Sequence, residues 1–98
     1  MNQYMIEMLL PTELNDEFIS MIPDHRERIN RLMQLGTITS YALAGDRSRV
    51  WATTAAETEA EVWEMLDTLP LRRFMSVQIY PLMFHQTLRL IGPRFSLN

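Results

Sequence analysis

The chain has 98 residues and a formal net charge of −3, and all nine of its Lys and Arg residues are arginines. This length suits one small domain. The absence of lysine excludes Schiff-base chemistry, and the absence of cysteine excludes thiolate nucleophiles and disulfides. Acidic and basic residues are interspersed, so we expect no nucleic-acid partner.

Segments that would indicate a membrane or a bound nucleotide are also missing. The N-terminal apolar run is short, has no basic start and contains Glu7, so we do not interpret it as a signal peptide. No stretch approaches the roughly 20 apolar residues of a membrane span. The three glycines lie far apart, which leaves no glycine-rich loop for a phosphate. We therefore expect a cytoplasmic protein with no cofactor and no membrane partner.

Hydrophobic periodicity predicts four strands and two helices. The strands are expected over 3–10, 37–44, 48–54 and 75–82, with a first helix from about 16 to 35 and a second ending near 68. Asn15 or Asp16 could cap the first helix, and Gly36 is suited to end it. Pro23 lies inside the helical pattern, which predicts a kink or a break there. Thr54 and Glu57 have the spacing of a capping box for the second helix.

The resulting order, βαββαβ, predicts an α+β, ferredoxin-like domain with a four-stranded antiparallel sheet. Two helices cover only one face of such a sheet. We expect the other face to carry the apolar side chains Met5, Leu9, Tyr41, Trp51 and Tyr80. A second copy of the chain is the simplest cover, which predicts a homodimeric α/β barrel, or a larger homo-oligomer, with a cavity between two sheets. Residues 1–98 form a single domain in this interpretation, with a tail over 84–98 that packs on the domain or on a partner subunit.

Two short motifs resemble muconolactone isomerases. The segment LPLRRFM, Leu69 to Met75, is similar to the LPLFPYM segment of that family, and PLMFH, Pro81 to His85, is similar to its PLxxH motif. The second strand departs from the family, because ITSYAL stands where the family has a basic, aromatic run of the WRHLWR kind. The resemblance implies a ferredoxin-like domain in a ring-like homo-oligomer, acting without a cofactor on a small lactone or related acid.

Moving a double bond in a lactone requires a group that removes a proton next to a carbonyl and returns it elsewhere. His25 is one candidate, because histidine titrates near neutrality; the alternative is a core-edge histidine bonded to the backbone. Glu7 is another, since a carboxylate facing a dry cavity accepts a proton more readily; the alternative is a glutamate paired with an arginine. Glu27 matches an acid in the family helix, although its spacing favours the surface.

Ligand-binding candidates come from the two motifs and from the uncovered face of the sheet. Arg72 and Arg73 could bind a substrate carboxylate through their guanidinium groups, or they could pair with acids in the chain or on a neighbouring subunit. His85 matches the family motif and could close the pocket or contact a subunit. Tyr41, Trp51 and Tyr80 could line the cavity while they pack.

The two histidines lie about sixty residues apart without other ligands nearby, so we expect no metal site. Three functions remain open. The first is a muconolactone-isomerase-like isomerase or proton-transfer enzyme, with a role in aromatic catabolism. The second is a non-catalytic barrel that binds a small molecule or serves as an accessory subunit. The third is a cofactor-free monooxygenase or cyclase on the same barrel.

Overall fold

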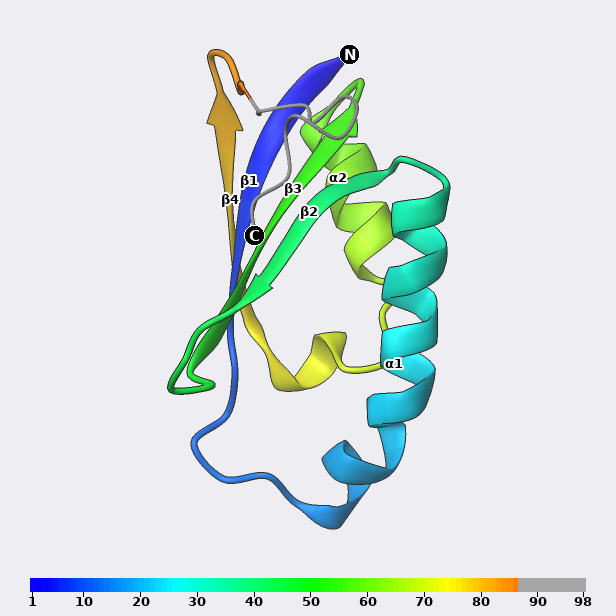
Figure 1. The fold of residues 1–98 in the computed structure, drawn as a ribbon, viewed down its shortest axis with the longest axis vertical. Helices are drawn as coiled ribbons and strands as arrows, with labels where there is room; N and C mark the ends of the chain where they lie inside the picture. The colour runs from blue at the N-terminus through cyan, green and yellow to red at the C-terminus, as the bar shows by residue number, and fades with distance from the viewer. Residues whose placement is uncertain (87–98) are drawn as a thin grey trace, which may run out of the picture.

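The computed structural model describes residues 1–86, which form one four-stranded sheet with two helices on one of its faces (Figure 1). The elements are β1 (Asn2–Leu9), α1 (Asp16–Gln34), β2 (Ile38–Leu43), β3 (Arg49–Ala56), α2 (Glu59–Leu66), the short 3₁₀ helix η1 (Arg72–Phe74) and β4 (Ser76–Leu82). The sheet is antiparallel, with strand order β2-β3-β1-β4. The predicted ferredoxin-like α+β fold is confirmed.

Strand β1 lies in the middle of the sheet and its side chains alternate between the two faces. Tyr4, Ile6 and Met8 are buried on the face that the helices cover. The residues between them, including Met5 and Glu7, lie on the opposite face, which we call the open face. The register of β1 with its two neighbours therefore decides which side chains surround Glu7.

Helix α1 begins where the sequence predicts and runs through Pro23 without a break. The side chain of Asn15 accepts a hydrogen bond from the backbone N–H of Phe18 at 2.7 Å, as an N-cap does. The first turns lie at an angle to the long remainder of the helix (Figure 1), so Pro23 kinks the helix rather than ending it. Gly36 follows the helix with a φ of 78°, a conformation that glycine adopts without strain.

The predicted start of the second helix is wrong by four residues. Strand β3 continues to Ala56, and the N-cap is Thr58, whose side chain accepts from the N–H of Glu61. Thr54 is instead fully buried and donates its hydroxyl to the backbone carbonyl of Thr37. The Thr54–Glu57 spacing fits a capping box, but Thr54 belongs to β3 and its hydroxyl is already bonded to the carbonyl of Thr37, so it does not cap the helix.

A bulge in β2 changes the face on which Tyr41 lies. The register shifts between Ile38 and Ser40, so Thr39 and Ser40 both lie opposite Thr53, and their hydroxyls bond to its Oγ1 at 2.7 and 2.6 Å. Tyr41 then pairs with Ala52, a buried residue of the helix-covered face. The expectation that Tyr41 faces the open side is therefore wrong, because one extra residue reverses the alternation.

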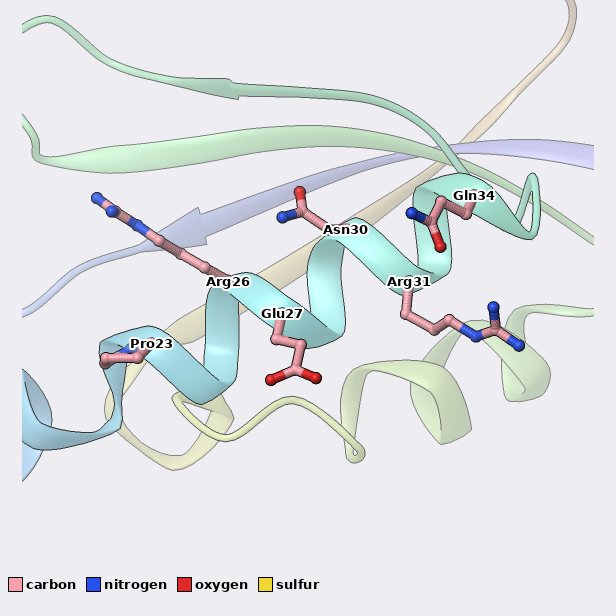
Figure 2. Close-up of a pocket in the computed structure, with 6 residues that line it drawn as sticks. All are labelled: Pro23, Arg26, Glu27, Asn30, Arg31 and Gln34. Carbon is pink, nitrogen blue, oxygen red and sulfur yellow. The ribbon is translucent and has the colours of Figure 1, made fainter.

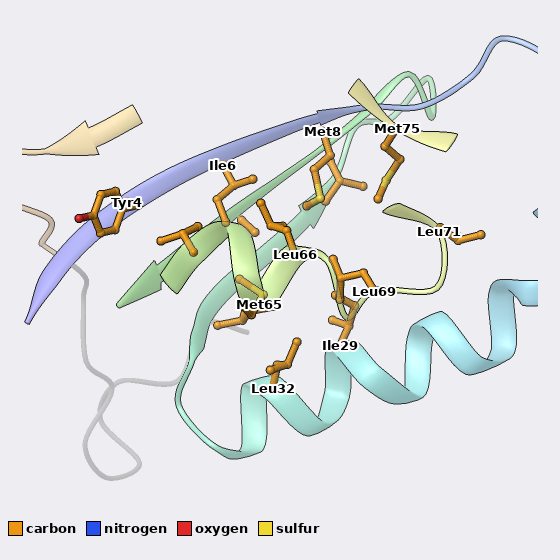
Figure 3. Close-up of a cluster of buried hydrophobic side chains, with 14 of the residues drawn as sticks. Tyr4, Ile6, Met8, Ile29, Leu32, Met65, Leu66, Leu69, Leu71 and Met75 are labelled. Atoms are coloured by element: carbon orange, nitrogen blue, oxygen red, sulfur yellow. The ribbon is translucent and has the colours of Figure 1, made fainter. Parts of the chain in front are cut away.

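The core fills the space between the sheet and the two helices (Figure 3). Its most deeply buried apolar side chains are Ile6, Met8, Val62 and Leu66, each no more than 1% exposed. No helix among residues 1–86 is long and apolar enough to cross a membrane. Of the predicted packed tail, Phe84, His85 and Gln86 are exposed, and the rest lies outside the described residues.

Candidate functional site

The open face of the sheet carries an ion pair between its two inner strands. Glu7 on β1 and Arg49 on β3 meet with 3.1 Å between Oε2 and Nη1, and 23% of the Glu7 side chain remains exposed. Because a guanidinium has five N–H donors, this bond leaves other donors of Arg49 available. The pair therefore sets a positioned carboxylate and a partly free cation beside each other.

Aromatic and polar side chains surround this pair. Trp51 on β3 and Gln78 on β4 are the direct neighbours of Glu7 across the sheet. Tyr80 donates its hydroxyl to Oε1 of Gln78 at 2.9 Å. Trp51, on the inner strand β3, is 40% exposed, and Tyr80, on the edge strand β4, is 44% exposed. A small acid or lactone on this face would meet an acid–base group, a cation, hydrogen-bonding groups and aromatic surface.

His25 lies on the other side of the sheet. It projects from α1 into the helix-covered side and is only 5% exposed. Its Nδ1 accepts a hydrogen bond from the backbone N–H of Leu71 at 3.3 Å, and burial lowers its pKa from the ordinary 6.5. The bond partner is thus a backbone amide, and the ring proton of neutral His25 lies on Nε2. These two candidates for the acid–base group, His25 and Glu7, therefore do not share a site within one chain, because the sheet separates them.

Tyr41 lies on the same side of the sheet as His25, whereas Trp51 and Tyr80 lie on the open face. The two residues line a hollow of about 310 Å³ between α1 and β2, together with Arg26, Ile29, Asn30 and Met33. Burial raises the pKa of the Tyr41 hydroxyl, and the nearby positive charge of Arg26 opposes this shift. The ligand-binding candidates predicted from the sequence are therefore divided between two faces.

The two arginines before β4 make contacts within the chain. The Arg72 guanidinium stacks 5.5 Å from the centre of the Trp63 ring and donates to the carbonyl of Met75 at 3.2 Å. Arg73 forms an ion pair with Glu17 in the first turn of α1. The structure supports the interpretation in which both arginines contact groups of the same chain. Neither guanidinium reaches the open face.

Two further candidates lie at the surface. Glu27 lines a hollow of about 560 Å³ whose six lining residues all belong to α1. Figure 2 shows these side chains spreading in different directions from the helix, so a single helix surface leaves a ligand unenclosed there. His85 follows the end of β4 and is exposed. Within residues 1–86, no cluster of histidine, aspartate and glutamate could hold a metal ion.

Arg49 and Gln78 are the members of the open-face site that sequence reasoning missed. Arg49 shares a strand face with Trp51, because the two are separated by one residue. That alternation was a usable signal. Gln78 is likewise separated from Tyr80 by one residue on its strand, so the same alternation indicated its face, and only its pairing with Glu7 required the register between β1 and β4.

The fold and this face define an α+β domain with one face covered by helices and one open face that carries a charged and aromatic centre. A family model described as muconolactone delta-isomerase matches residues 3–87. The chain therefore belongs to the muconolactone delta-isomerase family.

Among solved structures, the chain is similar to the one described as the crystal structure of muconolactone isomerase at 3.3 Å resolution. The TM-score is 0.72 at 17% sequence identity, and the match covers 92% of this chain and 97% of that chain. At this identity the likeness supports the fold alone. A comparison with curated proteins found no match.

Proposed function

We propose that this chain is a muconolactone-isomerase-like protein that moves a proton on a small lactone or carboxylic acid at the open face, without a cofactor. The observation that carries the proposal is the Glu7–Arg49 pair, a carboxylate and a guanidinium held 3.1 Å apart on the face that the helices leave uncovered. Membership of the family supports the reaction class.

The proposed roles follow from the chemistry of the two groups. In an α,β-unsaturated lactone, Glu7 removes a proton from the γ carbon, and the electron pair of the broken C–H bond moves through the double bond to the carbonyl oxygen, which gives a dienolate. The remaining N–H donors of Arg49 stabilise that negative charge. Glu7 then returns the proton to the α carbon, next to the carbonyl. The double bond has moved, and no atom or electron has been gained or lost.

The site requires cover, because general acid–base chemistry of this kind works best with water excluded. Trp51 and Tyr80 are too exposed in the single chain to provide it. A second copy that packs its own open face on this one would enclose both Glu7–Arg49 pairs. We therefore propose a homodimer or larger homo-oligomer as the active form.

The test is the substitution Glu7→Gln, assayed with muconolactone and related small lactones. The amide fills the same space but cannot take up the proton, so turnover should fall by about a hundred-fold or more while the fold is kept. Glu64→Gln is the matched control, because Glu64 is exposed on α2. Full activity in the Glu7→Gln protein would rule out the proposed base.

One observation favours a second candidate function. Arg49 already bonds Glu7, so the carboxylate is partly engaged before any substrate arrives. A barrel that binds a small acid without converting it would need only the cation and the aromatic surface. A wild-type protein that binds lactones saturably and converts none of them would select this binding function over the isomerase.

A further inference from the structure

The hollow between α1 and β2 has the composition of an anion-binding pocket, and it is separate from the open face. Five lining residues come from one side of α1 and the sixth, Tyr41, comes from β2. Two elements therefore line it, whereas the hollow around Glu27 is lined by α1 alone. Its volume of about 310 Å³ is at the lower end of the range of small-molecule sites, which suits a ligand with a single ring or a short chain.

The pocket combines apolar and polar walls. Ile29 is 4% exposed and Met33 is 41% exposed, so together they offer an apolar surface that extends from the core to the rim. Tyr41 adds a half-buried ring with a hydroxyl. Arg26 lines the same hollow as Tyr41, and its positive charge opposes the rise in the pKa of the Tyr41 hydroxyl.

Arg26 and Asn30, two polar residues that line this pocket, have N–H donors available for a ligand. Within residues 1–86, no ion pair forms at Arg26 and no hydrogen bond involves the Asn30 side chain. Figure 2 shows Arg26 and Asn30 pointing to the β2 side of α1, while Glu27 and Arg31 point the other way. The pocket thus gathers a guanidinium, an amide and a phenol without bringing in an acid.

We propose that this pocket binds a small organic monocarboxylate. The carboxylate pairs with Arg26 and accepts hydrogen bonds from Asn30 and Tyr41, while the apolar body of the ligand lies on Ile29 and Met33. Charge-assisted hydrogen bonds to a guanidinium supply the affinity, and the apolar wall selects organic acids over inorganic anions. The site is independent of the proposed function, because the sheet separates it from Glu7.

Benzoate is a suitable probe, since it joins one ring to one carboxylate. The full chain, with isoleucine and methionine methyl groups labelled, is titrated with benzoate and followed by NMR. We expect saturable shifts of the Ile29 and Met33 methyl signals. Arg26→Gln should raise the dissociation constant about tenfold or more, because it removes a charged partner. Tyr41→Phe should raise it by a smaller factor.

Arg31→Gln is the matched control, because Arg31 lies on the same helix but points away from the pocket. It should leave the affinity unchanged, and benzyl alcohol should bind more weakly than benzoate. Equal affinities of wild type and Arg26→Gln, or no saturable shift at Ile29 and Met33, would overturn the proposal. Shifts confined to Met5 would also overturn it, and they would place the acid on the open face, in agreement with the proposed function.

Discussion

Leu71 donates its backbone N–H to Nδ1 of His25 at 3.3 Å, and this bond joins positions 46 residues apart in the chain. It attaches the middle of α1 to the segment that leads from α2 into β4. Both partners are buried, at 5% exposure for His25 and 4% for Leu71. A buried amide without an acceptor costs about 1–3 kcal/mol, so His25 contributes to the stability of this segment rather than to the open-face site.

Stability should decline in mild acid because of His25. Burial lowers its pKa from 6.5 in the folded protein, so the unfolded chain takes up a proton first as the pH falls. The contribution of His25 is therefore complete above pH 6.5 and is lost as the pH falls toward the lower folded-state pKa. Protonation would also remove the acceptor for Leu71.

The measurement is the melting temperature as a function of pH for wild type and His25→Gln. Glutamine can accept the bond from Leu71 but does not titrate. We expect the stability of wild type relative to His25→Gln to fall as the pH decreases below 6.5. A difference that stays constant across this range would contradict the prediction.

Pro23→Ala should stabilise the protein. Helix α1 continues through Pro23, so alanine can donate the backbone hydrogen bond that proline lacks. The unfolded chain gains some freedom, which offsets part of the effect. We expect a net gain of about 1 kcal/mol, or roughly 4–8 °C in melting temperature. Asp24→Ala, at the next exposed position, is the control. An unchanged melting temperature would show that the hydrogen bond missing at Pro23 does not reduce stability in the kinked helix.

The open face should hold two or more copies together. Trp51 lies at its centre, and Trp51→Glu would place a second carboxylate beside Glu7. We expect light scattering to give at least a dimer for wild type at micromolar concentration and a smaller species for Trp51→Glu. Leu35→Glu, at the exposed C-cap of α1, should leave the mass unchanged. A monomeric wild type would contradict the prediction that a second copy covers the open face.

The two neighbouring arginines should differ in their effect on stability. The Arg72 side chain is 29% exposed and contacts Trp63 and the backbone of Met75. Arg73 is 59% exposed and pairs with an equally accessible glutamate, a kind of pair that contributes less than about 1 kcal/mol. Urea denaturation should show a loss of about 1–2 kcal/mol for Arg72→Ala and a smaller loss for Arg73→Ala. The reverse order would mean that Arg73 has a partner beyond this chain.

Local patterns in the sequence determined the class of fold. A short run that is apolar on both faces predicted β1, helical spacing predicted α1, and with the remaining segments these gave the order βαββαβ. The cap at Asn15 and the glycine at Gly36 marked the helix ends. The LPLRRFM segment and the PLMFH motif pointed to the family that the comparison then showed.

Only the tertiary structure decided which candidates share a site. A single extra residue in β2 turned Tyr41 to the helix side, and no local signal in ITSYAL marks that bulge. The partners of Glu7, Arg72 and Arg73 depend on strand register and on contacts between residues distant in the chain. Local periodicity sets the face of a side chain within its own element. Which elements meet across that face depends on packing of the whole domain, and this is why His25 and Glu7 are separated by the sheet.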